Sequence, residues 1–409
     1  MPGSTNNLSR AVAFSSNRPA TDRPEMISRV IPHAMNFAYR ARRFANIGAL
    51  VEHLRFTQLR DKYYRQLWSE AAERVGASHG NWRFGFSRIT KNGLTIIVRQ
   101  GEVMLDSHLT LELMGNKSLV YQLMAEMGFR IPHYCSYTMA TLKRAEKFLD
   151  ANPGQIVVKP AAGTGGGRGV TTGITDLAGL KKASRYAARF SPDLVVEQQI
   201  AGNSYRLLYL NGKFIDAVRR DQPLVVGDGK SSIRKLVAKQ NAHRLHNSPP
   251  TALSPLKIDH DASGWLAENA LSPSFRPQAG TEVLLKRAVN ENSAAQNHNV
   301  RKMVHPATIL MAASLVDNLG VELAGVDILC RDISKPLGAK NGLISEVNTT
   351  PGLHHHYLIA NPEMGTRVAE TLLEYMFKTG RGTLRLEKPQ VAENKKNIVA
   401  TALSGTGVD

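Results

Sequence analysis

The amino-acid sequence predicts an α+β fold in which helices are interspersed with short strands. Some segments place apolar residues at helical spacing, whereas others are short apolar runs bounded by Gly or Pro. Asn211-Gly212 separates two such runs by two residues, which predicts a tight β-hairpin, while other strands are separated by whole helices. A chain that mixes hairpins with helical crossovers fits packed α+β layers better than a doubly wound sheet.

The length and charge of the chain limit the classes of function. Its 409 residues are enough for two or three domains with an ample core. Lys and Arg outnumber Asp and Glu by 52 to 34, for a formal net charge of +18, which favours acidic partners such as nucleotides and carboxylates. The basic residues are scattered from Arg10 to Lys396 rather than gathered in one block, so binding to nucleic acid is not expected.

Membrane and secretory signals are not apparent in the sequence. It contains no run of about 18 apolar residues and no signal-peptide pattern, so we expect no membrane partner and a cytoplasmic location. The two cysteines, Cys135 and Cys330, lack the spacing of metal ligands and are expected to be buried, reduced thiols. We also expect a homo-oligomer.

A tail and an N-terminal domain are predicted at the start of the chain. Residues 1–24 are rich in Ser, Asn, Pro and Arg without hydrophobic periodicity, which indicates a disordered tail. Residues 25–105 are predicted to form a helical and β domain, with strands at Leu94–Arg99 and Glu102–Leu105. The apolar residues at helical spacing are Phe44, Ile47, Leu50, Val51 and Leu54.

The main domain is predicted over residues 106–378, followed by a loosely ordered tail over residues 379–409. Its predicted helices cover residues 116–127, 176–190, 306–319 and 367–377. Its predicted strands cover residues 155–159, 194–197, 205–210, 213–219, 326–330 and 342–347. Residues 227–277 are polar and rich in turn formers, and no element is predicted there.

A glycine-dense loop follows the strand that ends at Lys159. Five glycines fall within the seven residues Gly163–Gly169. Without Cβ atoms, the backbone N–H groups of such a loop can approach an anion closely, and Lys159 adds a positive charge. A phosphate-binding loop and a flexible connector both fit this pattern. The dinucleotide spacing G-x-G-x-x-G fails at Arg168 and Val170, which excludes that fingerprint.

Oxygen-bearing side chains occur on two later strands. Asp327 lies in an apolar strand, where a carboxylate without a partner is unfavourable. Glu346 and Asn348 are two residues apart on the next strand, so their side chains point to one face. Three oxygen ligands on adjacent strands suit Mg²⁺. An ordinary strand end before the turn at Pro351-Gly352 is the other interpretation.

Basic and histidine residues form two further groups. Lys117, Arg206 and Arg287 each lie near an element boundary, and each taken alone reads as a surface charge. The run His354-His355-His356 follows the acidic strand. Neighbouring side chains in an irregular loop cannot all point at one ion, so a three-histidine metal site is not expected. One histidine that contacts an acidic substrate is a hypothesis beside simple packing.

These motifs in this order resemble the ATP-grasp superfamily, and more narrowly the ATP-grasp part of cyanophycin synthetase. They resemble glutathione synthetase, RimK-type and D-alanine–D-alanine ligases less closely. The matching segments are Asn116-Lys117, Val157–Pro160, Gly163–Gly169, Val196-Glu197, Tyr205-Arg206, Val225–Ile233, Gly325–Asp327 and Glu346–Gly352. The resemblance covers about residues 100–378. It implies two α+β lobes that clasp ATP, with a lid subdomain over about residues 116–197 and a C-terminal lobe over about 198–378.

The resemblance also implies a role for each matched residue. The implied nucleotide contacts are Lys117, Lys159, Gly163, Gly165, Gly166, Gly167 and Gly169 of the lid, and Glu197, Gln198, Gln199 and Ile200 of the hinge strand. The implied catalytic residues are Arg206 and Arg287, which would steady the transferred phosphoryl group. The implied ligands of Mg²⁺, or of Mn²⁺ in its place, are Asp327, Glu346 and Asn348. The implied substrate contacts are Asn290 and His354.

The implied activity is an ATP-dependent carboxylate–amine ligase that forms an amide bond through an acyl phosphate. Its substrates are expected to be amino acids or a short peptide. Ser204 stands where relatives often carry an acid for the ribose, and Asn290–Gln296 lacks the paired glycines of cyanophycin synthetase. The Mur-ligase-like half of that enzyme has no counterpart in the match, so synthesis of the branched Asp–Arg polymer is not expected.

A second interpretation is a nucleotide-binding or phosphotransfer protein without ligase activity. Such a protein would associate with RNA through the basic N-terminal helices, where Arg40, Arg42 and Arg43 cluster. The simpler interpretation of this cluster is a solvated helix face.

Overall fold

The computed structural model describes residues 47–246 and 249–386. The predicted tail over residues 1–24, the predicted helical residues before Ile47 and the part of the predicted C-terminal tail from residue 387 onward therefore lie outside the described residues. Within the described ranges, the helices are too short or too polar to cross a membrane. Cys135 and Cys330 are both free thiols, but only Cys330 is fully buried.

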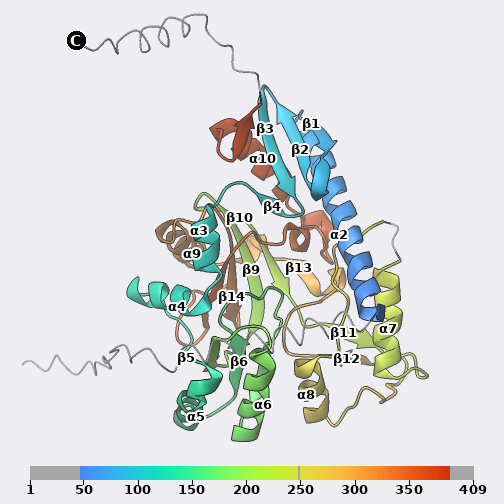
Figure 1. Cartoon of the computed structure of the whole chain (residues 1–409), viewed down its shortest axis with the longest axis vertical. Helices are drawn as coiled ribbons and strands as arrows, with labels where there is room; N and C mark the ends of the chain where they lie inside the picture. The colour runs from blue at the N-terminus through green and yellow to red at the C-terminus, as the bar shows by residue number, and fades with distance from the viewer. Residues whose placement is uncertain (1–46, 247–248, 387–409) are drawn as a thin grey trace, which may run out of the picture.

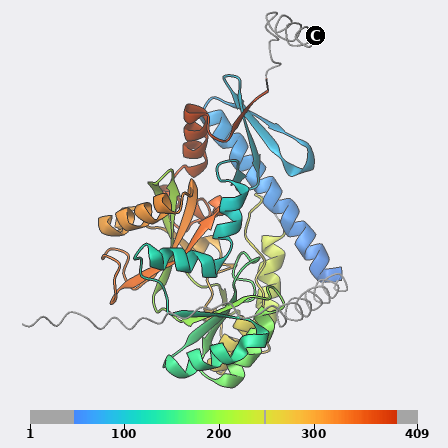
Figure 2. The ribbon, with the colours of Figure 1, turned by 60° about the vertical axis from the view of Figure 1, so that its left-hand side comes forward.

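The N-terminal unit is an antiparallel sheet packed against two helices (Figure 1). Its strands are β1 (Ser78–Asn81), β2 (Ser87–Lys91), β3 (Leu94–Arg99), β4 (Glu102–Val103) and β16 (Thr383–Arg385). Its helices are α2 (Ile47–Arg74) and α10 (Val368–Thr379), which contribute Trp68 and Leu372 to a shared buried core. Helix α2 continues from this sheet down one side of the molecule (Figures 1 and 2).

The expectation of a loosely ordered tail from residue 379 is wrong for its first residues. Thr383 pairs with Ile96, so strand β16 completes the N-terminal sheet. The preceding turn needs glycine, because Gly382 has a φ of +64° and a Cβ there would lie 2.4 Å from the carbonyl oxygen of Met104. Three residues are too few for a periodic pattern to predict a strand.

The lid subdomain contains a four-stranded antiparallel sheet with the order β5-β8-β6-β7. Its strands are β5 (Tyr134–Tyr137), β6 (Ile156–Pro160), β7 (Thr171–Ile174) and β8 (Leu194–Gln198). Its helices are α5 (Leu142–Ala151) and α6 (Leu177–Ala187). Asp176 begins α6, because its side chain accepts a hydrogen bond from the Gly179 amide. The glycine loop connects β6 to β7.

The central sheet has the order β13-β10-β9-β14-β15 and is antiparallel throughout. Its strands are β9 (Asn203–Leu210), β10 (Lys213–Arg220), β13 (Asn297–Asn299), β14 (Leu323–Cys330) and β15 (Gly342–Thr349). The helices associated with it are α3 (His108–Met114), α4 (Lys117–Glu126) and α9 (Pro306–Asn318). Asn211 and Gly212 both have positive φ, which confirms the predicted hairpin turn between β9 and β10.

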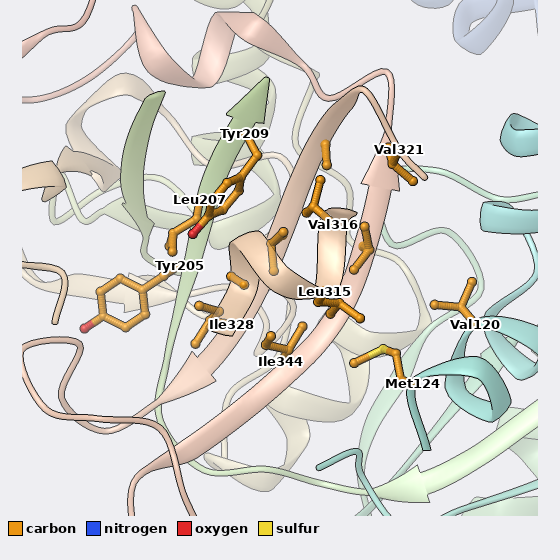
Figure 3. Close-up of a cluster of buried hydrophobic side chains, with 14 of the residues drawn as sticks. Val120, Met124, Tyr205, Leu207, Tyr209, Leu315, Val316, Val321, Ile328 and Ile344 are labelled. Carbon is orange, nitrogen blue, oxygen red and sulfur yellow. The ribbon is translucent and has the colours of Figure 1, made fainter. Parts of the chain in front are cut away.

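The two faces of the central sheet have opposite character. Tyr205, Leu207 and Tyr209 of β9 point into an apolar core that also contains Leu315 of α9 and Ile328 of β14 (Figure 3). Side chains alternate along a strand, so the residues between these point to the other face. Ser204 and Arg206 are two of them, whereas Leu208 and Leu210, farther along the same face, pack into the core shared with α2 and α10. The part of this face around Ser204 and Arg206 is where charged side chains meet, and we call it the polar face of the sheet.

An inserted unit includes residues 227–277, for which the sequence predicted no element, and the short strands on either side of them. It consists of β11 (Leu224–Val226), α7 (Ile233–Arg244), α8 (His260–Glu268) and β12 (Glu282–Leu284). These elements have a hydrophobic core of their own, to which α7 contributes Ile233, Leu236 and Val237. The sequence predicted no element over residues 227–277, and this expectation was wrong. The few apolar residues of α7 are interspersed with Lys, Arg and Asn, so they do not form a clear helical pattern.

Short 3₁₀ turns complete the described structure. They are η1 (Arg83–Gly85), η2 (Met139–Thr141), η3 (Ala294–Gln296), η4 (Arg301–Met303), η5 (Leu353–His356) and η6 (Pro362–Met364). One of them, η5, is joined to the central sheet by a fully buried pair, in which His356 Nδ1 lies 2.7 Å from Asp216 Oδ2. Asn299 and Thr366 each donate a hydrogen bond to Asp216 Oδ1 at 2.8 Å.

We predict that Asp216→Ala lowers the free energy of unfolding by about 3–5 kcal/mol, because it leaves buried donors without their acceptor. Burial opposes ionisation of Asp216, but hydrogen bonds and charge from His356 lower its pKa overall. A lowered folded-state pKa stabilises the protein above the unfolded value of about 3.9, and this stabilisation is lost as the pH falls below that value. Urea unfolding at several pH values measures both effects.

The exposed carboxylate of Glu363 provides a control, and Glu363→Ala should change the free energy of unfolding by less than about 0.5 kcal/mol. Equal stability of the Asp216 and Glu363 variants at pH 7 would contradict this interpretation of the buried pair.

Candidate active site

Three charged side chains lie next to one another on the polar face of the central sheet. In the antiparallel register, Arg206 of β9 is opposite Asp327 of β14, and Asp327 is opposite Glu346 of β15. Directly opposite residues project to the same face, so the register alone brings these three side chains together. Asn348, two residues after Glu346, lies on that face as well.

Arg206 and Asp327 form a bidentate ion pair. Arg206 Nε donates to Asp327 Oδ1 at 2.7 Å, and Arg206 Nη2 donates to Oδ2 at 2.6 Å. Asn348 Nδ2 donates to the same Oδ2 at 3.2 Å. The neighbouring position must be small, because a Cβ on Gly325 would lie 2.9 Å from Pro351 Cβ and 3.4 Å from Arg206 Cδ. The pair holds the aspartate in a fixed orientation within an apolar strand.

Lys117 connects the start of α4 to the acidic strand. Asn116 caps this helix through its side chain, and the Lys117 amide donates to the carbonyl of Ala161 at 2.8 Å. The Lys117 ammonium donates to Glu346 Oε1 at 2.7 Å. Burial alone would raise the pKa of Glu346, but the charges of Lys117, Lys159 and Arg206 lower it overall, so this carboxylate is ionised at neutral pH.

Lys159, near the end of β6, forms a second ion pair between a lysine and a glutamate. Its ammonium lies 2.7 Å from Glu197 Oε2 and donates to the Tyr121 hydroxyl at 2.9 Å. That hydroxyl lies 2.9 Å from Glu197 Oε2 and 3.0 Å from the carbonyl of Ser345. Burial and then the charge of Glu197 raise the pKa of Tyr121 well above its usual value, so the hydroxyl keeps its proton.

Tyr121 was missed by the sequence reasoning. It lies one helical turn after Lys117 on the same side of α4, and the residue reads as an ordinary core aromatic. Its hydroxyl links the lid strand β8 to the acidic strand β15. The i, i+4 spacing from the lysine was the available signal.

The glycine loop is held against Asn290. Asn290 Nδ2 donates to the carbonyl of Gly166 at 2.7 Å. Gly167 has a φ of +68°, and a Cβ there would lie 2.8 Å from Asn290 Nδ2, so this position accepts only glycine. Gly169 is similarly confined, since its Cβ would lie 2.7 Å from Pro160 Cγ. Asn290 therefore contacts the lid, and its role as a substrate contact stays a prediction.

The other predicted nucleotide contacts lie at the end of β8. The Gln198 amide donates to the carbonyl of His133 at 2.9 Å. The Gln199 side chain accepts from the Gly173 amide at 2.7 Å and donates to Gln155 Oε1 at 2.9 Å. Ile200 follows and is half-buried. Their predicted contact with a nucleotide base stays a prediction.

Arg287 contacts the inserted unit and the lid. Its Nη2 is 2.5 Å from Glu268 Oε2, and its guanidinium carbon lies 4.5 Å from the ring centroid of Trp265. It also packs against the lid strand, where a Cβ on Gly173 would come within 2.2 Å of Arg287 Nη1. The structure thus places Arg287 between the inserted unit and the lid, and its catalytic role stays a prediction.

The three consecutive histidines point to different partners. His354 Nδ1 lies 2.8 Å from the Tyr64 hydroxyl, whereas His356 pairs with Asp216. Burial, followed by the charges of Arg60 and Arg220, lowers the pKa of His354 well below its usual value. His354 is therefore neutral at pH 7. Its predicted contact with a substrate stays a prediction.

The chemistry of the donors on β14 and β15 fits a hard divalent cation. The carboxylates of Asp327 and Glu346 and the amide oxygen of Asn348 are the oxygen ligands that Mg²⁺ prefers. The carboxylates are balanced by Arg206 and Lys117. In residues 47–246 and 249–386, no group of three or more His, Cys, Asp and Glu is arranged to hold a metal ion. A site on this face would thus combine two carboxylates with an amide.

The inserted unit contacts strand β7 of the lid. Asp261, at the start of α8, accepts hydrogen bonds from the Thr172 amide and hydroxyl, both at 2.8 Å. His260 Nδ1 lies 3.2 Å from the Thr171 hydroxyl, and its ring stacks on Tyr186 of α6. These contacts, with the Asn290 contact, position the glycine loop from outside the lid subdomain.

The order of these elements and the charges that they bring together resemble those expected of an ATP-grasp ligase, and comparisons with known proteins support that resemblance. No protein-family model matches the chain. Cyanophycin synthetase of Trichormus variabilis is 27% identical over 273 residues, which are 66% of this chain and 30% of that protein. The glutathione biosynthesis bifunctional protein GshAB of Clostridium perfringens is 25% identical over 273 residues, 65% of this chain and 35% of that protein.

One solved structure that matches part of the chain is the bifunctional glutathione synthetase from Pasteurella multocida. It matches with a TM-score of 0.48 and 21% identity, over 76% of this chain and 43% of that one. The sequence comparisons confirm the predicted resemblance to the ATP-grasp part of cyanophycin synthetase, and the observed sheets and helices confirm the α+β fold class. The chain spans about 30% of the length of the cyanophycin synthetase that it matches.

We predict that Asp261→Ala increases the rate of trypsin cleavage after Arg168 at least tenfold. Arg168 lies exposed in the glycine loop, and the substitution removes two hydrogen bonds to a charged acceptor that hold strand β7. Each such bond contributes about 1.5–3 kcal/mol, which makes local opening more frequent. Mass spectrometry of a timed digest measures the cleavage.

Glu282→Ala changes an exposed carboxylate of the same inserted unit and is the control. If both variants are cut at the rate of the unchanged protein, the contacts from α8 do not restrain the glycine loop.

Proposed function

We propose that the protein is an ATP-dependent carboxylate–amine ligase. In this reaction an oxygen of the substrate carboxylate attacks the γ-phosphorus of ATP, and ADP leaves. An amine nitrogen then attacks the acyl carbon, the acyl–phosphate bond breaks, and phosphate and a proton are released as the amide forms. The substrates are amino acids or a short peptide.

The observation that carries this proposal is the convergence of Lys117, Lys159 and Arg206 on three carboxylates, of which two lie on one face of the central sheet and the third lies on lid strand β8. Each cation is held by an acidic partner at 2.6–2.7 Å. Phosphoryl transfer to a carboxylate brings several anions together, so its catalysis depends mainly on positioned cations and N–H donors. These lysines, which hydrogen-bond carboxylate oxygens here, are able to donate to phosphate oxygens in the same way.

Each part of the chain has a distinct task in this mechanism. Lys117, at the start of α4, and Lys159, near the end of β6, bind the phosphates. The loop Gly163–Gly169 closes over the phosphates and excludes water. Exclusion of water protects the acyl phosphate from hydrolysis. Arg206, oriented by Asp327, stabilises negative charge on the transferred group. Asp327, Glu346 and Asn348 would hold Mg²⁺, which supplies charge neutralisation to the phosphates when bound.

Two relatives support this reaction class. Cyanophycin synthetase and the glutathione biosynthesis protein are both named for a biosynthetic activity, and each matches about two-thirds of this chain. A phosphotransfer protein without ligase activity would release ADP independently of any amine. Dependence of ADP release on an added amine therefore separates the two functions.

We predict that Lys159→Met reduces ADP release by at least 100-fold while the fold is retained. Removing one positioned donor from a developing charge typically reduces the rate about 10²–10³-fold. A coupled assay of ADP over a panel of amino acids and dipeptides, with product mass, measures the effect. Lys147→Met, at an exposed lysine of the same subdomain, should leave the rate unchanged. Near-normal turnover of the Lys159 variant would rule out the proposed site.

We predict that Asn348→Ala raises the Mg²⁺ concentration needed for half-maximal ADP release about tenfold or more. The substitution removes one neutral oxygen ligand and the hydrogen bond to Asp327, but it leaves both carboxylates in place. Titration of Mg²⁺ at saturating ATP measures the change. An unaltered titration curve would place the metal elsewhere.

A further inference from the structure

A group of basic side chains from four elements borders the proposed site. We call it the basic cluster, and it consists of Arg60 of α2, Arg206 of β9, Arg220 of β10, and His354 and His355 of η5. Arg206 is balanced by Asp327. Within the described part of the chain, no carboxylate forms an ion pair with Arg60 or Arg220, although Arg219 beside the latter pairs with Asp221.

Helix α2 is connected to this cluster by a hydrogen bond to η5. The Tyr64 hydroxyl lies 2.8 Å from His354 Nδ1 and accepts a longer contact from the His354 amide at 3.4 Å. Arg60 precedes Tyr64 by one helical turn, and its guanidinium carbon lies 5.7 Å from the Tyr64 ring centroid. The rings of His354 and His355 are 4.0 Å apart. Arg60 is thus held at η5 by a fixed aromatic neighbour.

Arg220 enters the cluster from the end of β10. It is opposite Ser204 in the register, two residues before Arg206, so both arginines lie on the polar face of the sheet. Its Nη2 donates to the carbonyl of Val289 at 2.7 Å. The Nε atoms of Arg60 and Arg220 and the Nδ1 atom of His355 are buried without a hydrogen-bond partner. These three nitrogens belong to three elements that meet beside the site.

The electrostatic environment of the cluster is positive. Burial, followed by the charge of Arg206, lowers the pKa of Arg220 to about 10. Burial, His354 and then the charges of Arg220 and Arg206 lower the pKa of His355 well below its usual value. Both histidines are therefore neutral at pH 7, and the excess charge belongs to the arginines. Buried guanidinium groups without a carboxylate are unfavourable unless an anion joins them.

We propose that the basic cluster binds a second carboxylate of the acid substrate, and that Arg60 of α2 determines this specificity. The proposal rests on the ligase function, since the reacting carboxylate must lie beside Arg206 and the phosphate-binding lysines. The substrate class is then a dicarboxylic amino acid, or a peptide whose activated end carries one further acidic group. Helix α2 precedes the segment of about residues 100–378 that resembles the ATP-grasp ligases, so Arg60 comes from the N-terminal unit of this chain.

Ligand-induced thermal stabilisation tests the binding without turnover. The probes are L-glutamate, L-aspartate and succinate, each compared with the analogue in which one carboxylate is an amide, at equal ionic strength. A ligand that binds the folded state raises the melting temperature with its concentration. We expect the dicarboxylates to stabilise the full-length protein at concentrations at least tenfold lower than the monoamides do.

Two variants assign the effect to Arg60. Arg60→Gln should abolish the preference for dicarboxylates, whereas Arg55→Gln, at an exposed arginine of the same helix, should retain it. In the assay of ADP release, Arg60→Gln should raise KM for the dicarboxylate at least tenfold and leave KM for ATP unchanged. If Arg60 had only a structural role, Arg60→Gln would change KM for ATP as well as KM for the dicarboxylate, or it would lower the melting temperature of the protein without ligand.

Two results would overturn the inference. One is equal stabilisation by dicarboxylates and monoamides, and the other is an unchanged preference in Arg60→Gln. Failure of the ligase proposal looks different: every acid would fail to elicit ADP release, while stabilisation by dicarboxylates through Arg60 would persist.

Discussion

The ion pair between Arg206 and Asp327 is the interaction on which the remainder of the site depends. Asp327 occupies a strand whose alternate residues pack into the apolar core, so its charge is tolerable only with a partner that holds both oxygens. The antiparallel register supplies that partner from β9 and places Glu346 beside it from β15. One face of the sheet can then carry several charges while the opposite face remains a continuous hydrophobic core.

The site is assembled from several units of the chain, and two of the hydrophobic cores extend from the central sheet into neighbouring units. The lid contributes Lys159, and the central sheet contributes Asp327 and Glu346. Asp261 of the inserted unit and Asn290, which follows that unit, hold β7 and the glycine loop from outside the lid. The long helix α2 extends this arrangement, because Tyr64 ties the N-terminal unit to the turn that follows the acidic strand.

Elements with strong local signals were predicted well. The turn at Asn211-Gly212 needs positive φ at both residues, and few dipeptides supply it, so the hairpin was evident. Helices α7 and α8 were missed because their apolar residues are few and become buried only against one another and β12. Strand β16 was missed because pairing with β3, nearly 300 residues earlier, defines it. Tyr121 was missed because its i, i+4 spacing from Lys117 is equally compatible with an ordinary core tyrosine.

By itself, the sequence determined the types of side chain available, their order and the local elements that carry them, because periodicity and turn chemistry act over a few residues. Together with the resemblance to the ATP-grasp ligases, that was enough to name Lys117, Lys159, Asp327 and Glu346. Only the tertiary structure decided which of these side chains meet. Lys117 and Glu346 are 229 residues apart, and their contact depends on how the sheet pairs and how α4 packs on it. It also decided that Arg287 faces the lid, since the packing of the inserted unit directs that side chain.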